Sequence, residues 1–369
     1  MNPRGLKTLL ENFDQPFVIP NLLDWSILDW DLEQWNAALK GSVLKFRKGK
    51  IAHTKDPQWE SHTEIVEGTL DDFLKFCNDS HYWYYFDYKY LIEWFLDQKQ
   101  IRNDINWTKF GFEKFANDST IWIGTKGAHT PCHIDVYGFN LIAQIFGRKR
   151  WLLFPPNEDL LKTRVPYEES SIYSKINFYS PDENNLRGFD SCRELILEPG
   201  QVLFVPNGWW HYVENLETAI SINTWLPLTS DNEKRMQEAI VQMLMKILAS
   251  QVTEGDRNIL LNPNENIEES VYGCVRNIEA MKNIYRNAIK VPQRIELASE
   301  LYNKFKDNLV QPAVLSREEF TRLMVKQSRR FAKDKEESST NSSSDLIDVI
   351  NAITDCDVIE LIKNKMLGK

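Results

Sequence analysis

The feature of this sequence that most restricts its fold is a series of short β-prone runs between residues 119 and 228. The runs are rich in β-branched and aromatic residues, and glycine and proline punctuate them. They read TIWIG, NLIAQIF, RWLLFPP, ELILEPG, QVLFVPNGWW and AISINTWL. Short strands at this spacing predict a β sandwich or barrel.

The sequence on either side of this β region has a different character. The first part mixes short apolar runs with helix signals such as Thr69, which precedes LDDFLKF. After Pro227 the β signals stop, and the later stretch KDKEESSTNSSSD is charged, rich in serine and without apolar periodicity. The predicted units are an α+β region (1–115), a β core (116–228), a helical region (229–332), a flexible linker (333–345) and a short helical tail (346–369).

The helical pattern over residues 230–250 is strongly amphipathic, and Ser230 with Glu233 predicts a capping box at its start. Its apolar residues recur every three or four positions along one stripe: Met236, Ala239, Ile240, Met243, Leu244, Ile247 and Leu248. The stripe predicts packing on the body of the domain, and a homodimer interface is the alternative. Further helical patterns lie at about 267–289, 294–309 and 316–333, the last with a capping box at Ser316 and Glu319.

Composition sets the broad class of the protein. With 369 residues, 42% of them hydrophobic, the chain is long enough for a packed core in roughly two or three domain-sized units. Its 53 acidic and 44 basic residues give a net charge of −9, so nucleic acid is not expected as a partner. Five scattered cysteines without a CxxC pair, and no signal-peptide core or long apolar run, predict a protein of the cytoplasm or nucleus outside any membrane.

The stretch HTPCHIDVYGFN contains a pair of potential metal ligands, His133 and Asp135. In a strand, residues two positions apart point to the same face, so these two side chains project together while Cys132 points away. An imidazole and a carboxylate on one strand, completed by a histidine from another, form the facial triad that leaves open positions on Fe(II).

The third ligand must come from a distant part of the chain, and His211 is the candidate. The run EPGQVLFVPNGWWH passes through a Pro-Gly turn, a buried strand and a second turn, and delivers His211 at the start of a strand. A second HxE sequence contains His62, but it lies in a polar stretch and is predicted to be a surface residue. His129, at the entrance of its strand, is predicted to be a loop or pocket-rim residue.

Together, the motifs TPCHID, NLIAQIFGRKRWLLFPP, PGQVLFVPNGWWHYV and SINTW resemble the Jumonji C (JmjC) domain of Fe(II)- and 2-oxoglutarate-dependent oxygenases. The resemblance covers about residues 10–250 and is greatest to the hypoxia-inducible-factor asparaginyl hydroxylase group. It implies an α+β fold with a double-stranded β-helix core, the jelly roll of cupins, completed by N-terminal α+β elements and followed by C-terminal helices. It also implies Fe(II), 2-oxoglutarate and O2, which together hydroxylate a protein side chain with release of succinate and CO2.

The same resemblance assigns roles to individual residues around the metal. Lys149, chosen from the run RKR, would hold the distal carboxylate of 2-oxoglutarate together with the hydroxyl groups of Thr130 and Tyr85. A cation with neutral donors holds a carboxylate without burying an unpaired charge. Tyr85 is selected from YWYYFDYKY, which offers several tyrosines. The remaining pocket contacts implied are Asn140, Asn223 and Trp225.

Other functions stay open at the level of sequence. Asp135 as the acidic ligand favours a hydroxylase, because many demethylases of the family carry Glu, but an N-methyl group can undergo the same oxidation. A tRNA-base hydroxylase is disfavoured by the net charge of −9. A binding or scaffold protein is an alternative of another class, since a member of the family associates with a small heat-shock protein. The expected partner of an enzyme would be a protein or peptide substrate.

Overall fold

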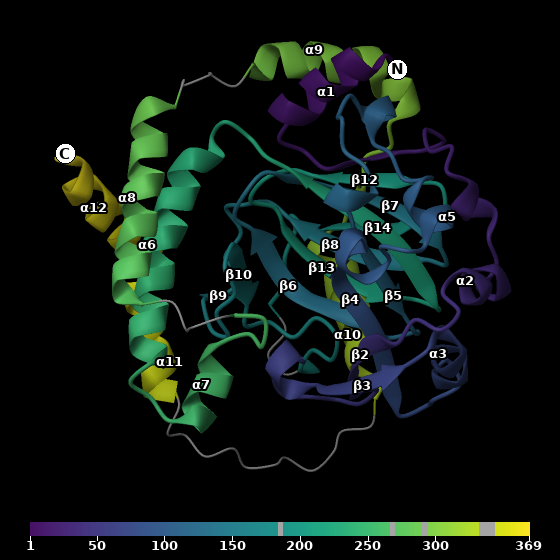
Figure 1. The fold of residues 1–369 in the computed structure, drawn as a ribbon, viewed down its shortest axis with the longest axis horizontal. Coiled ribbons are helices and arrows are strands. Elements are labelled where there is room, and N and C mark those ends of the chain that lie inside the picture. The colour runs from purple at the N-terminus through teal and green to yellow at the C-terminus, as the bar shows by residue number, and fades with distance from the viewer. Residues whose placement is uncertain (184–186, 266–269, 289–293, 332–343) are drawn as a thin grey trace.

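A computed structural model describes residues 1–183, 187–265, 270–288, 294–331 and 344–369. Its strands form two antiparallel sheets that face one another (Figure 1). The larger sheet contains β1 (Phe17–Ile19), β2 (Leu44–Lys50), β3 (Glu64–Gly68), β4 (Tyr82–Tyr90), β5 (Thr120–Gly124), β7 (Phe139–Phe146), β12 (Val202–Val205) and β14 (Ala219–Leu226). The smaller sheet contains β6 (His129–Asp135), β8 (Lys149–Phe154), β9 (Lys162–Thr163), β10 (Ser171–Ser174), β11 (Arg193–Leu197), β13 (Trp210–Asn215) and β15 (Ala313–Val314).

Consecutive strands alternate between the two sheets from β5 to β8 and again from β11 to β14, while β8 to β11 all lie in the smaller sheet. This is the arrangement of a double-stranded β-helix. The larger sheet has the order β1-β12-β7-β14-β5-β4-β2-β3, and the smaller sheet has the order β15-β11-β8-β13-β6-β10-β9. In the smaller sheet, β13 lies between β8 and β6, two strands that precede it in the chain. The predicted α+β fold with a cupin-like core is therefore confirmed, and β1 to β4 extend the larger sheet from the N-terminal region.

Helices cover the outer faces of both sheets. The described α-helices are α1 (Pro3–Asn12), α2 (Leu32–Ala38), α3 (Leu70–Phe76), α4 (Leu91–Trp94), α5 (Lys99–Arg102), α6 (Asp231–Ala249), α7 (Glu254–Leu260), α8 (Val271–Asn287), α9 (Ile295–Phe305), α10 (Arg317–Ser328), α11 (Ser344–Ile353) and α12 (Cys356–Leu367). On the larger sheet, Leu9 of α1 and Phe73 of α3 share one buried cluster with Ile123 of β5. On the smaller sheet, Phe320 of α10 packs against Phe154 of β8, with 5.9 Å between ring centroids. None of the helices in the described part of the chain is long and apolar enough to cross a bilayer.

A third apolar cluster fills part of the space between the two sheets. Its buried members come from both sheets and the adjoining loops: Val18, Ile142, Trp151, Leu153, Leu197, Leu203, Val205, Trp209 and Val213. Three of them, Ile142, Trp151 and Val213, also line a small cavity beside the predicted metal ligands. The apolar cluster thus closes one side of the space in which the polar site lies.

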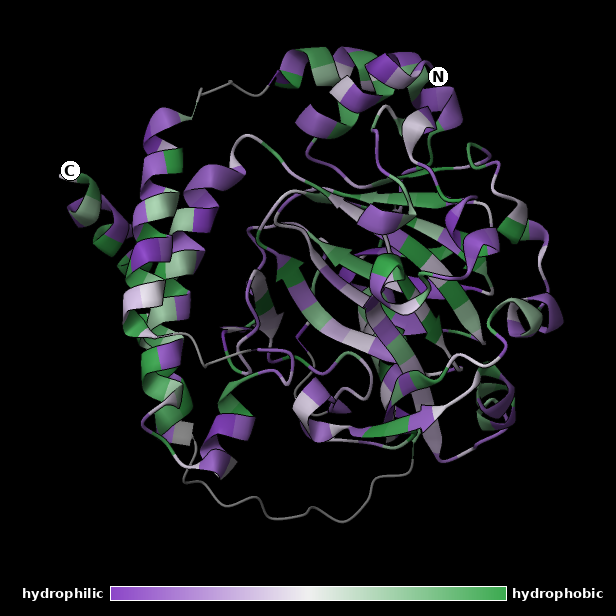
Figure 2. Ribbon diagram, in the orientation of Figure 1, coloured by the Kyte–Doolittle hydropathy of each residue, from purple (hydrophilic) through white to green (hydrophobic). Residues whose placement is uncertain are grey.

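The apolar stripe predicted over residues 230–250 lies on α6 and is covered by the chain itself. Met236 and Ile240 are buried. Ile240 shares a cluster with Ile278 of α8 and Ile359 of α12, and Figure 2 shows apolar segments where α6 and α8 lie side by side. Of the two alternatives for this stripe, packing within the chain is therefore observed. A homodimer through the same helix stays a prediction for measurement in solution.

Two of the predicted helix starts are correct and one is wrong. Thr69 and Ser316 each accept a hydrogen bond from the third residue of the helix that follows, and each is part of a capping box. Ser230 makes no such bond, because its backbone is already helical at φ −67° and ψ −18°. Asp231 takes over this end of the helix instead, and its carboxylate accepts hydrogen bonds from two backbone N–H groups of the preceding chain.

The C-terminal predictions are met in part. The pattern at about 316–333 corresponds to α10, which ends at Ser328. The tail predicted as one short helix forms two, α11 and α12. The linker predicted over 333–345 lies, apart from its last two residues, outside the described residues.

Candidate metal and cosubstrate site

The pairing of two strands brings the three predicted metal ligands together. His133 and Asp135 lie at the end of β6 and project from the same face of that strand. His211 lies near the start of β13, and β13 pairs directly with β6 so that His211 is the register partner of His133. Residues far apart in the chain therefore become neighbours through one β ladder.

The three side chains are arranged as a metal site would require. One ligand atom from each of His133, Asp135 and His211 lies within 4.8 Å of the others, and this is the one such group of three or more among the described residues. His133 Nε2 is 3.8 Å from Asp135 Oδ1, and His211 Nε2 is 3.8 Å from Asp135 Oδ2. Two imidazoles and one carboxylate are the donor set of the facial triad for non-haem Fe(II), so these residues fit that ion.

Both imidazoles are held in the tautomer that a metal needs. In each case the Nδ1–H donates to the carbonyl oxygen two positions earlier in the chain. His133 donates to Pro131 O at 2.9 Å, and His211 donates to Trp209 O at 3.0 Å. Each Nε2 therefore keeps its lone pair on the side of Asp135. Burial, and secondly the charge of His211, lower the pKa of His133 to about 4, so its ring is neutral at pH 7.

Trp225 fixes the orientation of the carboxylate. Its indole Nε1–H donates to Asp135 Oδ2 at 3.0 Å. Trp225 lies on β14 of the facing sheet, so this bond joins the two sheets at the metal site. The predicted place of Trp225 beside the ligands is therefore observed, and its contact is a hydrogen bond to a ligand as well as a wall of the pocket.

Beside the three ligands lies an inner cavity of ≈ 40 Å³, and Lys149 stands in its wall. Lys149 is 1% exposed, and its Nζ donates to Ser221 Oγ at 2.7 Å and to the Tyr85 hydroxyl at 3.3 Å. Within the part of the chain that the structure describes, no carboxylate is recorded in an ion pair with it. Burial lowers the pKa of Lys149 to about 7. A buried cation held only by neutral hydroxyls fits a ligand that brings its own carboxylate.

The other predicted contacts of the cosubstrate line the same inner cavity. Tyr85 is fully buried, and Thr130 lines the same cavity. Tyr84, the next candidate in YWYYFDYKY, points to the opposite face, and its hydroxyl donates to Asp79 at 2.9 Å. Strand alternation therefore places Tyr85 beside Lys149 and turns Tyr84 away from it, and the role of Tyr85 toward a cosubstrate stays a prediction.

Two asparagines are fixed relative to one another at this cavity. Asn223 Nδ2 donates to Asn140 Oδ1 at 2.8 Å, and Asn223 Oδ1 accepts from the indole of Trp122 at 2.7 Å. Sequence reasoning placed both asparagines in the pocket but missed Trp122 and Ser221. The alternation of SINTW could have identified Ser221, since Ser221, Asn223 and Trp225 share one face of β14.

Of the other histidine and cysteine predictions, that for His129 is wrong, and those for Cys132 and His62 agree with the structure. His129 is not a loop or rim residue: it is 2% exposed at the start of β6 and stacks on Tyr179 with ring centroids 3.9 Å apart. It lines neither cavity, and burial lowers the pKa of its ring to about 4. Cys132 points away from the ligands into the apolar cluster on the outer face of the sheet. His62 is exposed, as predicted.

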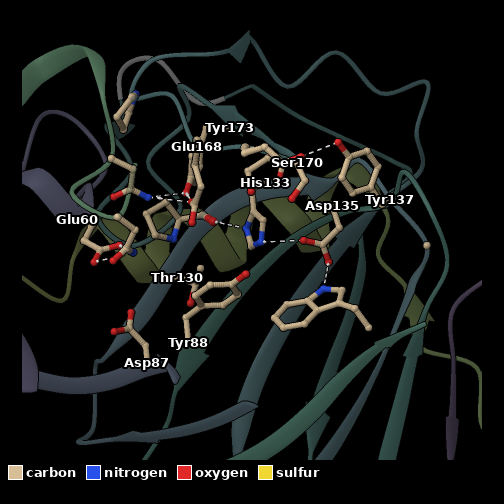
Figure 3. Close-up of a pocket in the computed structure, with 18 of the residues that line it drawn as sticks. Glu60, Asp87, Tyr88, Thr130, His133, Asp135, Tyr137, Glu168, Ser170 and Tyr173 are labelled. Atoms are coloured by element: carbon tan, nitrogen blue, oxygen red, sulfur yellow. Dashed lines mark hydrogen bonds and ion pairs between the residues drawn. The ribbon is translucent and has the colours of Figure 1, made fainter. Parts of the chain in front are cut away.

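An outer cavity of ≈ 370 Å³ opens from His133 and Asp135 (Figure 3). Tyr88 stands in its wall in a left-handed backbone conformation, φ 53°, where the pairing of β4 with β5 is irregular. Its ring lies against Trp225, with centroids 5.4 Å apart. Glu60 and Glu168 also line this cavity. Sequence reasoning missed these three residues, because no motif predicts a bulge or the shape of the loops that carry the two glutamates.

A double-stranded β-helix that carries two histidines and one aspartate on paired strands defines a protein of the cupin type with a candidate metal centre. Residues 9–232 match the cupin-like domain. The chain belongs to this cupin-like family, which includes the JmjC proteins.

Three relatives illustrate the range of the family. HSPB1-associated protein 1 of Bos taurus is 41% identical over 288 residues, which are 73% of this chain and 59% of that protein. Arginine-specific demethylase JMJ20 of Arabidopsis thaliana is 36% identical over 141 residues, or 36% of this chain and 29% of that protein. The 2-oxoglutarate and iron-dependent oxygenase JMJD4 of Gallus gallus is 32% identical over 157 residues, or 36% of this chain and 35% of that protein. The chain thus spans less than two thirds of the length of these relatives.

Proposed function

We propose that this protein is an Fe(II)- and 2-oxoglutarate-dependent oxygenase that hydroxylates a side chain of a protein substrate. One observation carries the proposal: His133, Asp135 and His211 offer three ligand atoms within 4.8 Å of one another. Lys149 lies beside them, buried and without a carboxylate partner among the described residues, and this supports the proposal that 2-oxoglutarate is the cosubstrate. A relative named as a 2-oxoglutarate and iron-dependent oxygenase gives further support.

The residues of the site divide the work of such a reaction. Iron with 2-oxoglutarate and O2 would supply an oxidation in which a substrate C–H becomes C–OH and 2-oxoglutarate becomes succinate and CO2. One oxygen atom of O2 enters the alcohol and the other enters succinate. His133, Asp135 and His211 would hold the iron and leave positions open for the other groups. Lys149, Tyr85 and Thr130 would bind the distal carboxylate, and the burial of Lys149 and Tyr85 would keep water away from that end of the cosubstrate.

Anaerobic visible absorption tests the proposal directly. Addition of Fe(II) and then 2-oxoglutarate should produce a charge-transfer band in the wild-type protein, because the cosubstrate would chelate the bound metal. His211→Ala should form no band and show no iron-dependent succinate release while it keeps its fold. His62→Ala is a matched control, since His62 is exposed and outside both cavities. Full activity in His211→Ala would show that His211 is not an iron ligand and would contradict the proposed set of three ligands.

Two alternative functions, a scaffold protein and an arginine demethylase, are suggested by the names of two relatives. HSPB1-associated protein 1 suggests a binding or scaffold protein whose partner is a small heat-shock protein. JMJ20 suggests demethylation of arginine, while hydroxylation of a tRNA base has no relative among these three to support it. A folded wild-type protein that forms no absorption band would favour the scaffold over every oxygenase.

A further inference from the structure

The inner cavity that contains Lys149 is closed on every side except its boundary with the outer cavity. The residues that line the inner cavity alone are all buried, between 1% and 6% exposed: Tyr85, Asn140, Ile142, Lys149, Trp151, His211, Val213, Ser221 and Asn223. Four residues line both cavities and are half-buried: Trp122, Thr130, His133 and Trp225. A ligand from solvent therefore reaches Lys149 through the outer cavity and past these four residues.

The inner cavity is too small for 2-oxoglutarate as it stands. Its ≈ 40 Å³ gives room for roughly three water molecules, which is less than a dicarboxylic acid needs. The two tryptophans at the boundary are held by their indole N–H groups, Trp225 by Asp135 at 3.0 Å and Trp122 by Asn223 at 2.7 Å. Entry of 2-oxoglutarate therefore requires a movement beside these two fixed rings.

Tyr88 contacts both tryptophans from the side of the outer cavity. Its ring centroid is 5.4 Å from that of Trp225 and 6.0 Å from that of Trp122, and each pair is inclined at 65°. Edge-to-face contacts of this kind are weakly attractive and can re-form after a movement. Tyr88 lines the outer cavity but not the inner one. Figure 3 shows it beside Thr130 and below His133.

The backbone at Tyr88 is suited to a side chain that moves. The pairing of β4 with β5 changes register between Phe86 and Lys89, so Tyr88 lies in a bulge outside the regular ladder. Its φ of 53° is strained for a residue other than glycine, and such strain is common at switch regions. The preceding Asp87 is fixed by a buried ion pair with Arg47, whereas Tyr88 is 39% exposed. The Tyr88 ring can therefore turn without disturbing the sheet.

We propose that Tyr88 is a gate at the entrance to the inner cavity. In the observed position its ring covers the boundary at Trp122 and Trp225, and rotation of the ring toward solvent opens a path to Lys149. Tyr88 thereby controls how fast 2-oxoglutarate enters and leaves, and it contributes little to the affinity because it does not line the inner cavity. The inference rests on the proposed oxygenase function, because it concerns the cosubstrate of the same site.

Stopped-flow absorption under anaerobic conditions measures the rate of entry. The iron-loaded protein is mixed with 2-oxoglutarate, and the growth of the charge-transfer band gives kon, while an equilibrium titration of the same band gives Kd. Tyr88→Ala should raise kon by about 10-fold or more, because an open minor state is typically populated at only 0.1–10%. Its Kd should change by less than about 2-fold, because a gate alters the path and not the bound state.

Three further variants separate the ring from other effects. Tyr88→Gly should accelerate entry as Tyr88→Ala does, and glycine adopts the left-handed backbone without strain, so folding is not at risk. Tyr88→Phe keeps the ring and should keep the wild-type kon. Tyr82→Ala is the matched control, since Tyr82 lies on the same strand, is 36% exposed and lines neither cavity.

Four results would overturn the inference. The first is an unchanged kon in Tyr88→Ala and Tyr88→Gly. The second is a weaker Kd with an unchanged kon, which would mean that Tyr88 contacts the bound cosubstrate. The third is an equal acceleration in Tyr88→Phe, which would exclude the ring as the barrier. The fourth is an equal acceleration in Tyr82→Ala, which would indicate general loosening of β4.

The same band separates this inference from the proposed function. If the wild-type protein forms no band at any concentration of 2-oxoglutarate, the oxygenase function has failed and the inference with it. If the band forms at the same rate in the wild-type protein, Tyr88→Ala and Tyr88→Gly, the oxygenase function stands and the gate is wrong.

Discussion

At the scale of the residue, Lys149 is the group whose charge would respond most directly to the proposed cosubstrate. Burial lowers its pKa to about 7, so above pH 7 the protein without cosubstrate holds Lys149 largely neutral. A carboxylate beside it would raise the pKa again, and binding would take up a proton. Uptake should be small below pH 7, where Lys149 is already charged, and the affinity for 2-oxoglutarate should fall as the pH rises above 7.

Calorimetry measures this proton uptake. At pH 8, the heat of 2-oxoglutarate binding to the metal-loaded protein should differ between two buffers of different ionisation enthalpy. Lys149→Arg should abolish that difference, because a guanidinium stays charged throughout this range. Equal heats for the wild-type protein in both buffers would contradict the role of Lys149.

The variant Trp225→Phe tests whether the hydrogen bond from Trp225 to Asp135 contributes to metal affinity. Trp225→Phe removes the donor that lies 3.0 Å from Asp135 Oδ2 but keeps an aromatic ring. Loss of such a supporting hydrogen bond typically costs 10–100-fold in metal affinity, so we expect Fe(II) binding to weaken by about 10-fold or more. Anaerobic metal titration gives the affinity, and Trp94→Phe serves as a comparison outside both cavities. An equal affinity in the two variants would mean that the bond does not support the metal.

The residues of the site differ in how well the sequence predicts them. His133, Asp135 and His211 could be identified because strand alternation and the order of the turns place them on facing positions of neighbouring strands. Glu60 could not be identified, because the polar stretch WESHTEIVEG has the composition of an exposed surface. Glu168 lies in a loop whose path depends on tertiary contacts, and no local pattern of residues encodes that path.

At the scale of the element, α6 is fixed to the β core by a buried ion pair. Arg164 donates to both oxygens of Glu238, at 3.0 and 2.5 Å, and the side chains are 9% and 2% exposed. Arg164→Met would leave the carboxylate of Glu238 buried without a cation, and this should lower the free energy of unfolding by roughly 3–5 kcal/mol. Urea denaturation provides the measurement.

A double variant separates the lost pair from the lost packing. Arg164→Met combined with Glu238→Leu removes both charges and should recover most of the stability, because a buried pair replaced by apolar groups is often nearly neutral. A double variant as unstable as the single one would show that the two side chains stabilise α6 independently of their charges.

The elements themselves could be predicted where a local signal determines them. The capping boxes at Thr69 and Ser316 are of this kind. The prediction that Ser230 caps the start of α6 was wrong. Asp231 instead accepts hydrogen bonds from the backbone N–H groups of Gly138 and Leu228, and Gly138 lies far away in the sequence. Likewise the covering of α6 by α8 and α12 depends on contacts that a single amphipathic stripe does not specify.

At the scale of the whole molecule, the site joins the two sheets, so ligands bound there should stabilise the entire β core. Mn(II) with 2-oxoglutarate is a suitable probe, because Mn(II) accepts similar ligands without oxidation. At a concentration of 100 times Kd, binding to the folded state alone adds about 2.7 kcal/mol to the free energy of unfolding. We expect the Tm of the wild-type protein to rise by several degrees, and that of His211→Ala to stay constant in the same titration. An equal rise in both proteins would place the binding elsewhere.

The oligomeric state is a separate property of the whole molecule. Since α6 is covered within the chain, we expect sedimentation velocity to show a monomer at low concentration. A mass that doubles as concentration rises, and that Ile247→Glu prevents, would instead support the homodimer predicted through this helix, because Ile247 is the member of the stripe that is 37% exposed.

The position of β13 between β8 and β6 has a consequence for how the protein is made. During synthesis, β6 and β8 leave the ribosome well before β13, and each then has an unpaired edge where β13 will later insert. Exposed strand edges pair readily with other chains, so the unfinished polypeptide is prone to aggregate until residues 210–215 are available. If His133, Asp135 and His211 hold a metal as proposed, its binding would follow that insertion, because His211 lies on the last strand to enter the centre of the smaller sheet. Nascent chains stalled before this point should therefore depend on chaperones, whereas completed chains should not.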